Sequence, residues 1–114
     1  MNWHELPHQT RADLFGGQGA VQIWDLLGRG NAPPFSAVLR CELAPNSSVG
    51  PHKQQRDPEL VICLDGNGFI SVDQQEVPFQ PGAMVYLPHG SSLALRNPSD
   101  NTPLQYFIIK GRTP

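Results

Sequence analysis

The chain lacks the features that mark several classes of protein. It has 2 cysteines in 114 residues and no CxxC spacing, so neither a disulfide framework nor a thiolate zinc site is indicated. Its 8 Lys and Arg against 10 Asp and Glu form no basic stripe, which argues against nucleic acid as a partner. Apolar runs such as 60–64 are too short to span a membrane, and the N-terminus lacks the apolar stretch of a signal peptide. We therefore expect a soluble, cytoplasmic protein with no membrane partner.

Proline and glycine, by contrast, are plentiful and evenly spread. The 12 prolines and 11 glycines separate short apolar runs, which excludes long helices and is typical of an all-β protein. Apolar Leu39 and Cys41 alternate with charged Arg40 and Glu42, the period of two that indicates a strand with one solvated face. We expect strands or extended segments at 20–27, 36–43, 49–54, 59–64, 69–72, 76–79, 83–87, 91–96 and 104–109. This density of short strands and tight turns predicts a jelly roll or similar double-sheet β-barrel.

The strand pattern does not extend to the N-terminus. Residues 1–19 are of mixed composition and end in the glycine-rich break 16–19, so we expect an N-terminal arm there, followed by a single barrel domain over 20–114. The arm has little core of its own to join, and the edge strands of a short barrel need covering. We therefore expect a homodimer.

One cluster of polar side chains stands out as a candidate site. His52 and Gln54 are two residues apart and share one face of an extended chain. Glu59 opens the next strand, on the same face as apolar Val61 and Cys63, where a carboxylate is costly unless it is paired, hydrogen-bonded or bound to metal. We expect this strand to lie beside the one that carries His52 and Gln54, so that the Glu59 side chain could meet the other two across the pair.

The spacing of these residues resembles the cupin family. Its first motif reads His-x-His, three or four residues, Glu, six residues, Gly, and here His52, Gln54, Glu59 and Gly66 stand at those positions. The second motif resembles the stretch from Gly82 through 88–90 to Leu93 and Asn97. The resemblance covers about Ser36 to Ile109 and implies a small two-sheet barrel, often dimeric, with an internal pocket.

The resemblance also implies a metal site, and two of its positions depart from the family pattern. The metal ligands of cupins would fall on His52, Gln54, Glu59 and Leu93, so one histidine is replaced by an amide and another by a hydrocarbon side chain. His52, Gln54 and Glu59 could hold a divalent ion such as Zn, Fe, Mn or Ni weakly, with water completing the shell. We favour the alternative, a metal-free pocket lined by the same three residues.

Three functions follow from this pattern. The first is a small-molecule-binding cupin, and its pocket is predicted to be lined by His52, Gln54, Glu59, Val61, Cys63, Val85 and Leu93. If it is an enzyme, which the sequence leaves open, His52 and Glu59 are the acid–base candidates for proton transfer at a carbonyl or sugar carbon. The second is a metal-dependent dioxygenase or isomerase, and the third is a non-catalytic regulatory or interaction module.

Arg40 and Arg96 would be anion ligands if they entered the pocket, although a solvated strand face is the default for both.

Overall fold

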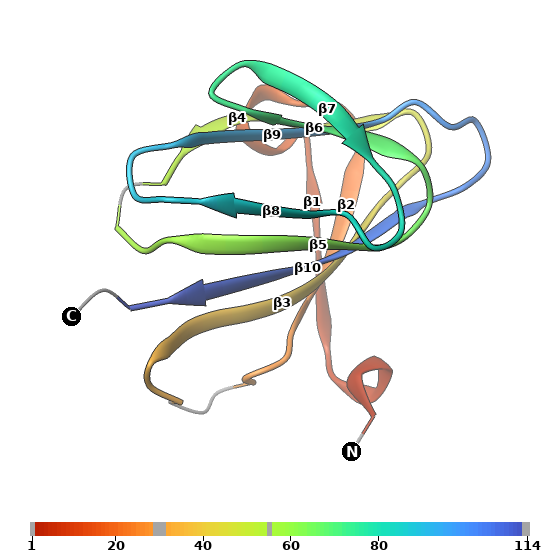
Figure 1. The fold of residues 1–114 in the computed structure, drawn as a ribbon. Coiled ribbons are helices and arrows are strands. Elements are labelled where there is room, and N and C mark those ends of the chain that lie inside the picture. Colours follow the sequence, from red (N-terminus) through yellow and green to blue (C-terminus); the bar gives the residue numbers. More distant parts are fainter. Residues whose placement is uncertain (1, 29–31, 55, 113–114) are drawn as a thin grey trace.

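The computed structural model describes residues 2–28, 32–54 and 56–112, which form two antiparallel sheets facing each other (Figure 1). The larger sheet has the order β1-β2-β3-β10-β5-β8 and the smaller one β4-β9-β6-β7. The strands are β1 (His8–Ala12), β2 (Ala20–Asp25), β3 (Phe35–Leu43), β4 (Ser47–Lys53), β5 (Glu59–Asp65), β6 (Gly68–Val72), β7 (Gln75–Phe79), β8 (Met84–Leu87), β9 (Ser92–Asn97) and β10 (Leu104–Gly111). Two short 3₁₀ turns, η1 (Trp3–Glu5) and η2 (Leu14–Gly16), complete the elements.

The all-β double-sheet fold predicted from the sequence is confirmed. From β2 onward each strand begins and ends within about two residues of the predicted span, because Pro and Gly interrupt the chain where the strands stop. Strand β1 was not predicted. It lies within the expected N-terminal arm and pairs with β2, from His8 opposite Trp24 to Ala12 opposite Ala20. Its polar sequence and full exposure leave no alternation to detect.

Alternate residues of both sheets form the core between them. In β5, Glu59, Val61 and Cys63 are buried and point inward, as the alternation predicted. The largest fully buried side chains are Tyr106, Phe79, Leu43, Ile70, Leu87, Leu93 and Leu104. The core therefore fills one part of the space between the sheets, beyond the cavity described below.

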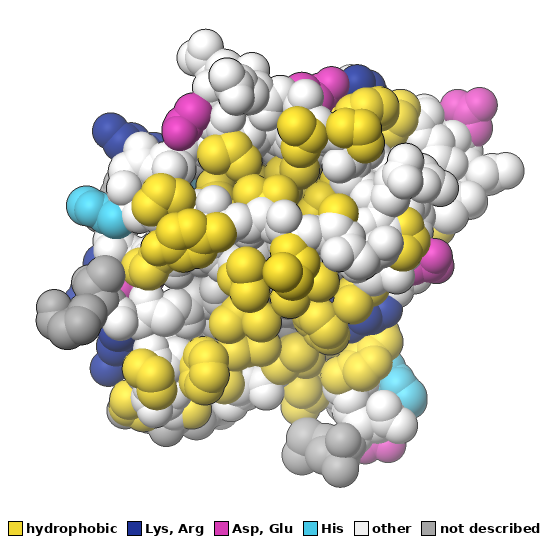
Figure 2. Space-filling model, viewed as in Figure 1, with side chains coloured by type: hydrophobic (Ala, Val, Ile, Leu, Met, Phe, Trp, Pro, Cys, Tyr) yellow, Lys and Arg dark blue, Asp and Glu magenta, His cyan; other side chains and the backbone are white. Residues whose placement is uncertain are grey.

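The outer face of the larger sheet is apolar over β5, β8 and β10. Its partly or fully exposed side chains are Leu60, Ile62, Met84, Tyr86, Phe107 and Ile109, which the strand register places side by side. Figure 2, in the orientation of Figure 1, shows hydrophobic side chains gathered over these strands. Among the described residues, no helix has the length and apolar character needed to cross a membrane.

One predicted pairing is wrong. The sequence placed Glu59 on a strand paired with the one that carries His52 and Gln54, but β4 pairs with β9 and β5 pairs with β10 and β8. The two strands lie in opposite sheets. His52 and Glu59 therefore approach each other from facing sheets.

Candidate functional site

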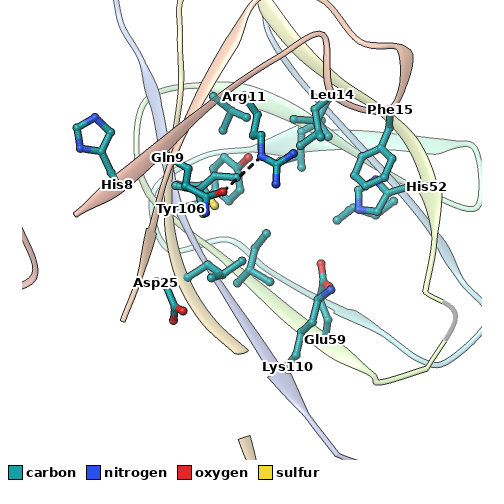
Figure 3. A pocket seen from close by; sticks show the side chains of 18 of the residues that line it. His8, Gln9, Arg11, Leu14, Phe15, Asp25, His52, Glu59, Tyr106 and Lys110 are labelled. Carbon is teal, nitrogen blue, oxygen red and sulfur yellow. Dashed lines mark hydrogen bonds and ion pairs between the residues drawn. The ribbon is translucent and has the colours of Figure 1, made fainter. Parts of the chain in front are cut away.

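A cavity of about 740 Å³ lies between the two sheets and opens toward β1 and the loop that follows it (Figure 3). Its polar lining comes from His8, Gln9, Arg11, Asp25, His52, Glu59, Tyr106 and Lys110. Its apolar lining comes from Leu6, Pro7, Leu14, Phe15, Val21, Ile23, Leu39, Cys41, Val49, Leu93, Leu95 and Ile108, and Gly28 lies at the rim. The volume falls in the range of about 300–1,000 Å³ that is usual for pockets holding small organic molecules.

Glu59 is the buried charge of this cavity. The residue is 2 % exposed, and the register of β5 and β10 sets it directly opposite Lys110, whose Nζ lies 3.6 Å from Oε2. Burial raises the pKa of the Glu59 carboxyl, and the Lys110 ammonium and Gln54 amide offset only part of that rise. Neither carboxylate oxygen has a hydrogen-bond partner within the described part of the chain. Both acceptor atoms are almost inaccessible to solvent and remain unsatisfied inside the barrel.

His52 faces the cavity from the smaller sheet. Its Nδ1 lies 3.1 Å from the Gly50 carbonyl oxygen. Since a carbonyl oxygen accepts only, Nδ1 carries the proton, and in the neutral ring Nε2 is left as an acceptor. Burial lowers the pKa of His52, and the positive charge of Lys110 lowers it further, while the Gly50 hydrogen bond opposes them. The lowered pKa favours the neutral imidazole, in which Nε2 is able to accept a proton.

The loop 13–19, which we call the strap, joins β1 to β2 and covers His52. The Phe15 ring stacks on the imidazole, with 4.1 Å between ring centroids and 13° between planes. Phe15 holds a left-handed φ of 53°, which is unfavourable for a residue with a Cβ. The strap backbone also approaches β4 closely, since a Cβ added at Gly50 would lie 1.9 Å from the Phe15 carbonyl oxygen. Glycine at position 50 is thus what allows the strap to sit on the site.

Strand β1 adds a cation to the cavity. Gln9 and Arg11 pair with Ile23 and Val21 of β2, and all four residues line the cavity. Figure 3 shows the Arg11 guanidinium pointing into the cavity from the side opposite Glu59 and Lys110. Arg11 Nε donates a long hydrogen bond of 3.4 Å to Gln9 Oε1, which leaves the terminal nitrogens for an anion.

The structure brings together some of the predicted site residues and separates others. His52, Glu59 and Leu93 line the cavity. Gln54, Val61, Cys63 and Val85 do not line it, so the geometry gives no support to their predicted contact with a ligand. Val61 and Cys63 point inward but belong to the packed core. Gln54 follows the last residue of β4 and is buried, and its amide is close enough to Glu59 to lower the pKa of that carboxyl.

The basic residues that line the cavity were missed by the sequence reasoning. Lys110 had a usable signal, because it follows Tyr106 and Ile108 at a period of two on one strand face. No signal in the sequence indicated Arg11, since β1 was not predicted. Arg40 and Arg96 keep the solvated strand faces expected as their default: Arg40 donates to Gln105 and stacks on Trp3, and Arg96 pairs with Glu76.

The residues present do not fit the metal site implied by the cupin pattern. Leu93 contributes a hydrocarbon side chain at a ligand position, Gln54 lies outside the cavity lining, and Glu59 already faces an ammonium group. No group of three or more His, Cys, Asp or Glu side chains is placed to hold a metal ion within 2–28, 32–54 and 56–112. The cationic partner of Glu59 in this chain is a lysine.

A family model described as Cupin domain matches residues 39–110, which include all strands from β4 to β9 and most of β3 and β10. The chain belongs to the cupin family. An oxalate-binding protein from Thermotoga maritima is 30% identical over 107 residues, covering 92% of this chain and 87% of that protein.

Solved cupin-like structures agree with the fold described here. The crystal structure of a predicted oxalate decarboxylase from Thermotoga maritima superposes with a TM-score of 0.90 at 26% identity, covering 98% of this chain and 97% of the other. The polyketide cyclase RemF from Streptomyces resistomycificus superposes with a TM-score of 0.77 at 13% identity, covering 100% and 80%, which shows the shared fold alone. The similarity to the predicted oxalate decarboxylase thus reaches beyond the residues that the family model matches.

Proposed function

We propose that this cupin binds a small organic acid in the barrel cavity, with the ligand's carboxylate held by Arg11. The observation that carries the proposal is the guanidinium of Arg11 pointing into a cavity of about 740 Å³ whose far side holds the buried Glu59. A guanidinium matches a carboxylate with two parallel hydrogen bonds. The name of the oxalate-binding relative from Thermotoga maritima supports a carboxylate ligand.

Calorimetric titration of the purified protein with oxalate, lactate, succinate and benzoate tests this proposal. We expect saturable binding of at least one of the four acids, weakened tenfold or more by Arg11→Gln. The matched control is Arg96→Gln, which removes the same charge from the outer face of β9, outside the cavity lining. The proposal fails if all four acids give no heat of binding, or if both variants bind as the wild type does.

A second candidate function is proton transfer to and from the bound acid. It is favoured by the hydrogen bond from His52 Nδ1 to the Gly50 carbonyl, which leaves Nε2 as an acceptor in the neutral ring. Burial also lowers the pKa of His52 and raises that of Glu59. In this role Nε2 takes a proton from the carbon next to a carbonyl group, and solvent returns one. Deuterium incorporation into the methyl group of pyruvate in D₂O, followed by NMR, tests it. A rate equal to that of buffer, or one unchanged in His52→Gln, contradicts it.

We also propose that two copies of the chain pair through the apolar outer face of β5, β8 and β10. Met84 and Tyr86 are 65% and 61% exposed on this face, next to the sheet edge. The six side chains named above for this face carry no charge, so the face is complementary to itself under a two-fold axis. The pairing would cover the β8 edge region that the monomer leaves open.

A further inference from the structure

The cavity is larger and more apolar than the binding of one carboxylate group requires, and its far end holds a second polar pair. From these two features we propose that the ligand is an organic acid with an apolar body and a hydroxyl group opposite its carboxylate, as in a hydroxyaryl acid. This inference rests on the proposed function, because it takes Arg11 as the carboxylate anchor.

The apolar body is inferred from the walls of the cavity. The apolar lining of the cavity includes Ile23, Leu39, Val49, Leu93, Leu95 and Ile108. These side chains come from both sheets, so a ligand between them would be enclosed by hydrocarbon on two sides. Apolar surface buried there strengthens binding in proportion to its area, whereas a ligand made only of carboxylate groups gains nothing from it.

The hydroxyl group is inferred from the pair at the other end. Glu59 offers two acceptor oxygens without hydrogen-bond partners among the described residues, and the Lys110 ammonium beside it is a donor. A second carboxylate placed there would repel Glu59, and an ammonium would repel Lys110. A hydroxyl group satisfies both neighbours, since it donates to the carboxylate and accepts from the ammonium.

Four compounds separate the parts of this proposal in calorimetric titrations of the wild-type protein. The full probe is 3-(4-hydroxyphenyl)propionate. The probe without the hydroxyl is 3-phenylpropionate, the one without the carboxylate is 4-hydroxyphenylethanol, and the one without an apolar body is oxalate. We expect the full probe to bind at least tenfold more tightly than oxalate and about fivefold more tightly than either truncated aryl compound.

A variant then locates the hydroxyl contact. In Glu59→Leu, which replaces the carboxyl group by an apolar side chain of similar size, 3-(4-hydroxyphenyl)propionate and 3-phenylpropionate should bind equally. Oxalate binding as tightly as the full probe overturns the inference while the carboxylate proposal stands. Equal binding of the hydroxylated and plain aryl acids by the wild type overturns the assignment of the hydroxyl to Glu59 and Lys110. Binding of none of the three acids removes the carboxylate proposal itself, and this inference with it.

Discussion

Lys110 Nζ lies 3.6 Å from Glu59 Oε2 where β10 and β5 run side by side, so the buried carboxylate of the cavity faces a cation supplied by the chain itself. The ion pair with Lys110 explains how the carboxylate of Glu59, a residue that is only 2 % exposed, is tolerated in the barrel interior.

This pair makes stability depend on pH in a definite direction. The pKa of Glu59 is raised in the folded state, so between its ordinary value of 4.5 and the raised value the folded protein binds more protons than the unfolded chain. The stability associated with Glu59 is therefore present below pH 4.5 and is lost as pH rises through the folded pKa. We expect Glu59→Gln to be more stable than the wild type at pH 8 by about 1 kcal/mol, and equally stable at pH 4.

Lys110→Met is the companion variant, with the opposite expected sign. It leaves the Glu59 carboxylate without its cation, so it should destabilise the protein at pH 8 by about 2–3 kcal/mol and have little effect at pH 4. Urea unfolding at the two pH values measures both variants. A Lys110→Met protein as stable as the wild type at pH 8 would show that the pair has no energetic role.

His52 offers a test of the site without substitution. Its folded pKa lies below the ordinary 6.5, because burial outweighs the hydrogen bond to Gly50. The ring should therefore remain mostly neutral at pH 6.5, with the proton on Nδ1 and an unprotonated Nε2. Long-range ¹H–¹⁵N correlation spectra report both the tautomer and the titration midpoint. A midpoint above 6.5, or the proton on Nε2, contradicts the assignment.

The strap depends on the absence of a side chain at position 50. A Cβ there would lie 1.9 Å from the Phe15 carbonyl oxygen, so Gly50→Ala must displace the strap or β4. Overpacking of this kind costs about 1–3 kcal/mol, and it should also break the stacking of Phe15 on His52. Gly111→Ala is the matched control, because its added Cβ meets no atom closer than 4.0 Å. Thermal unfolding and the His52 ring shifts of the two variants provide the measurement.

The two cysteines should be inert in the folded protein. Burial raises the pKa of Cys41 to about 12 and that of Cys63 to about 11, so almost no thiolate is present at pH 8. We expect a disulfide-exchange reagent to label less than one thiol per chain within minutes under native conditions and both thiols in urea. Fast labelling of the native protein would place a cysteine in contact with solvent.

The sequence was informative wherever a strand has one wet and one dry face. Alternation in β5 predicted that Glu59 points inward, and Pro and Gly predicted where the strands from β2 onward stop. It failed at Arg11, because an edge strand exposed along its whole length carries no pattern of burial. The sheet that each strand joins is also invisible to local spacing, which is why Gln54 and Glu59 were placed on neighbouring strands.

The apolar face of the larger sheet yields the last prediction. If two copies pair through β5, β8 and β10, a charge at the exposed Met84 would be buried without a partner at the interface. We expect the wild type to elute as a dimer in size-exclusion chromatography with light scattering at micromolar concentration, and Met84→Glu as a monomer. Asn101→Glu, which adds the same charge in the exposed loop after β9, should remain dimeric. A monomeric wild type contradicts the pairing, as does a dimeric Met84→Glu, because a self-complementary interface at this face cannot accommodate two facing carboxylates.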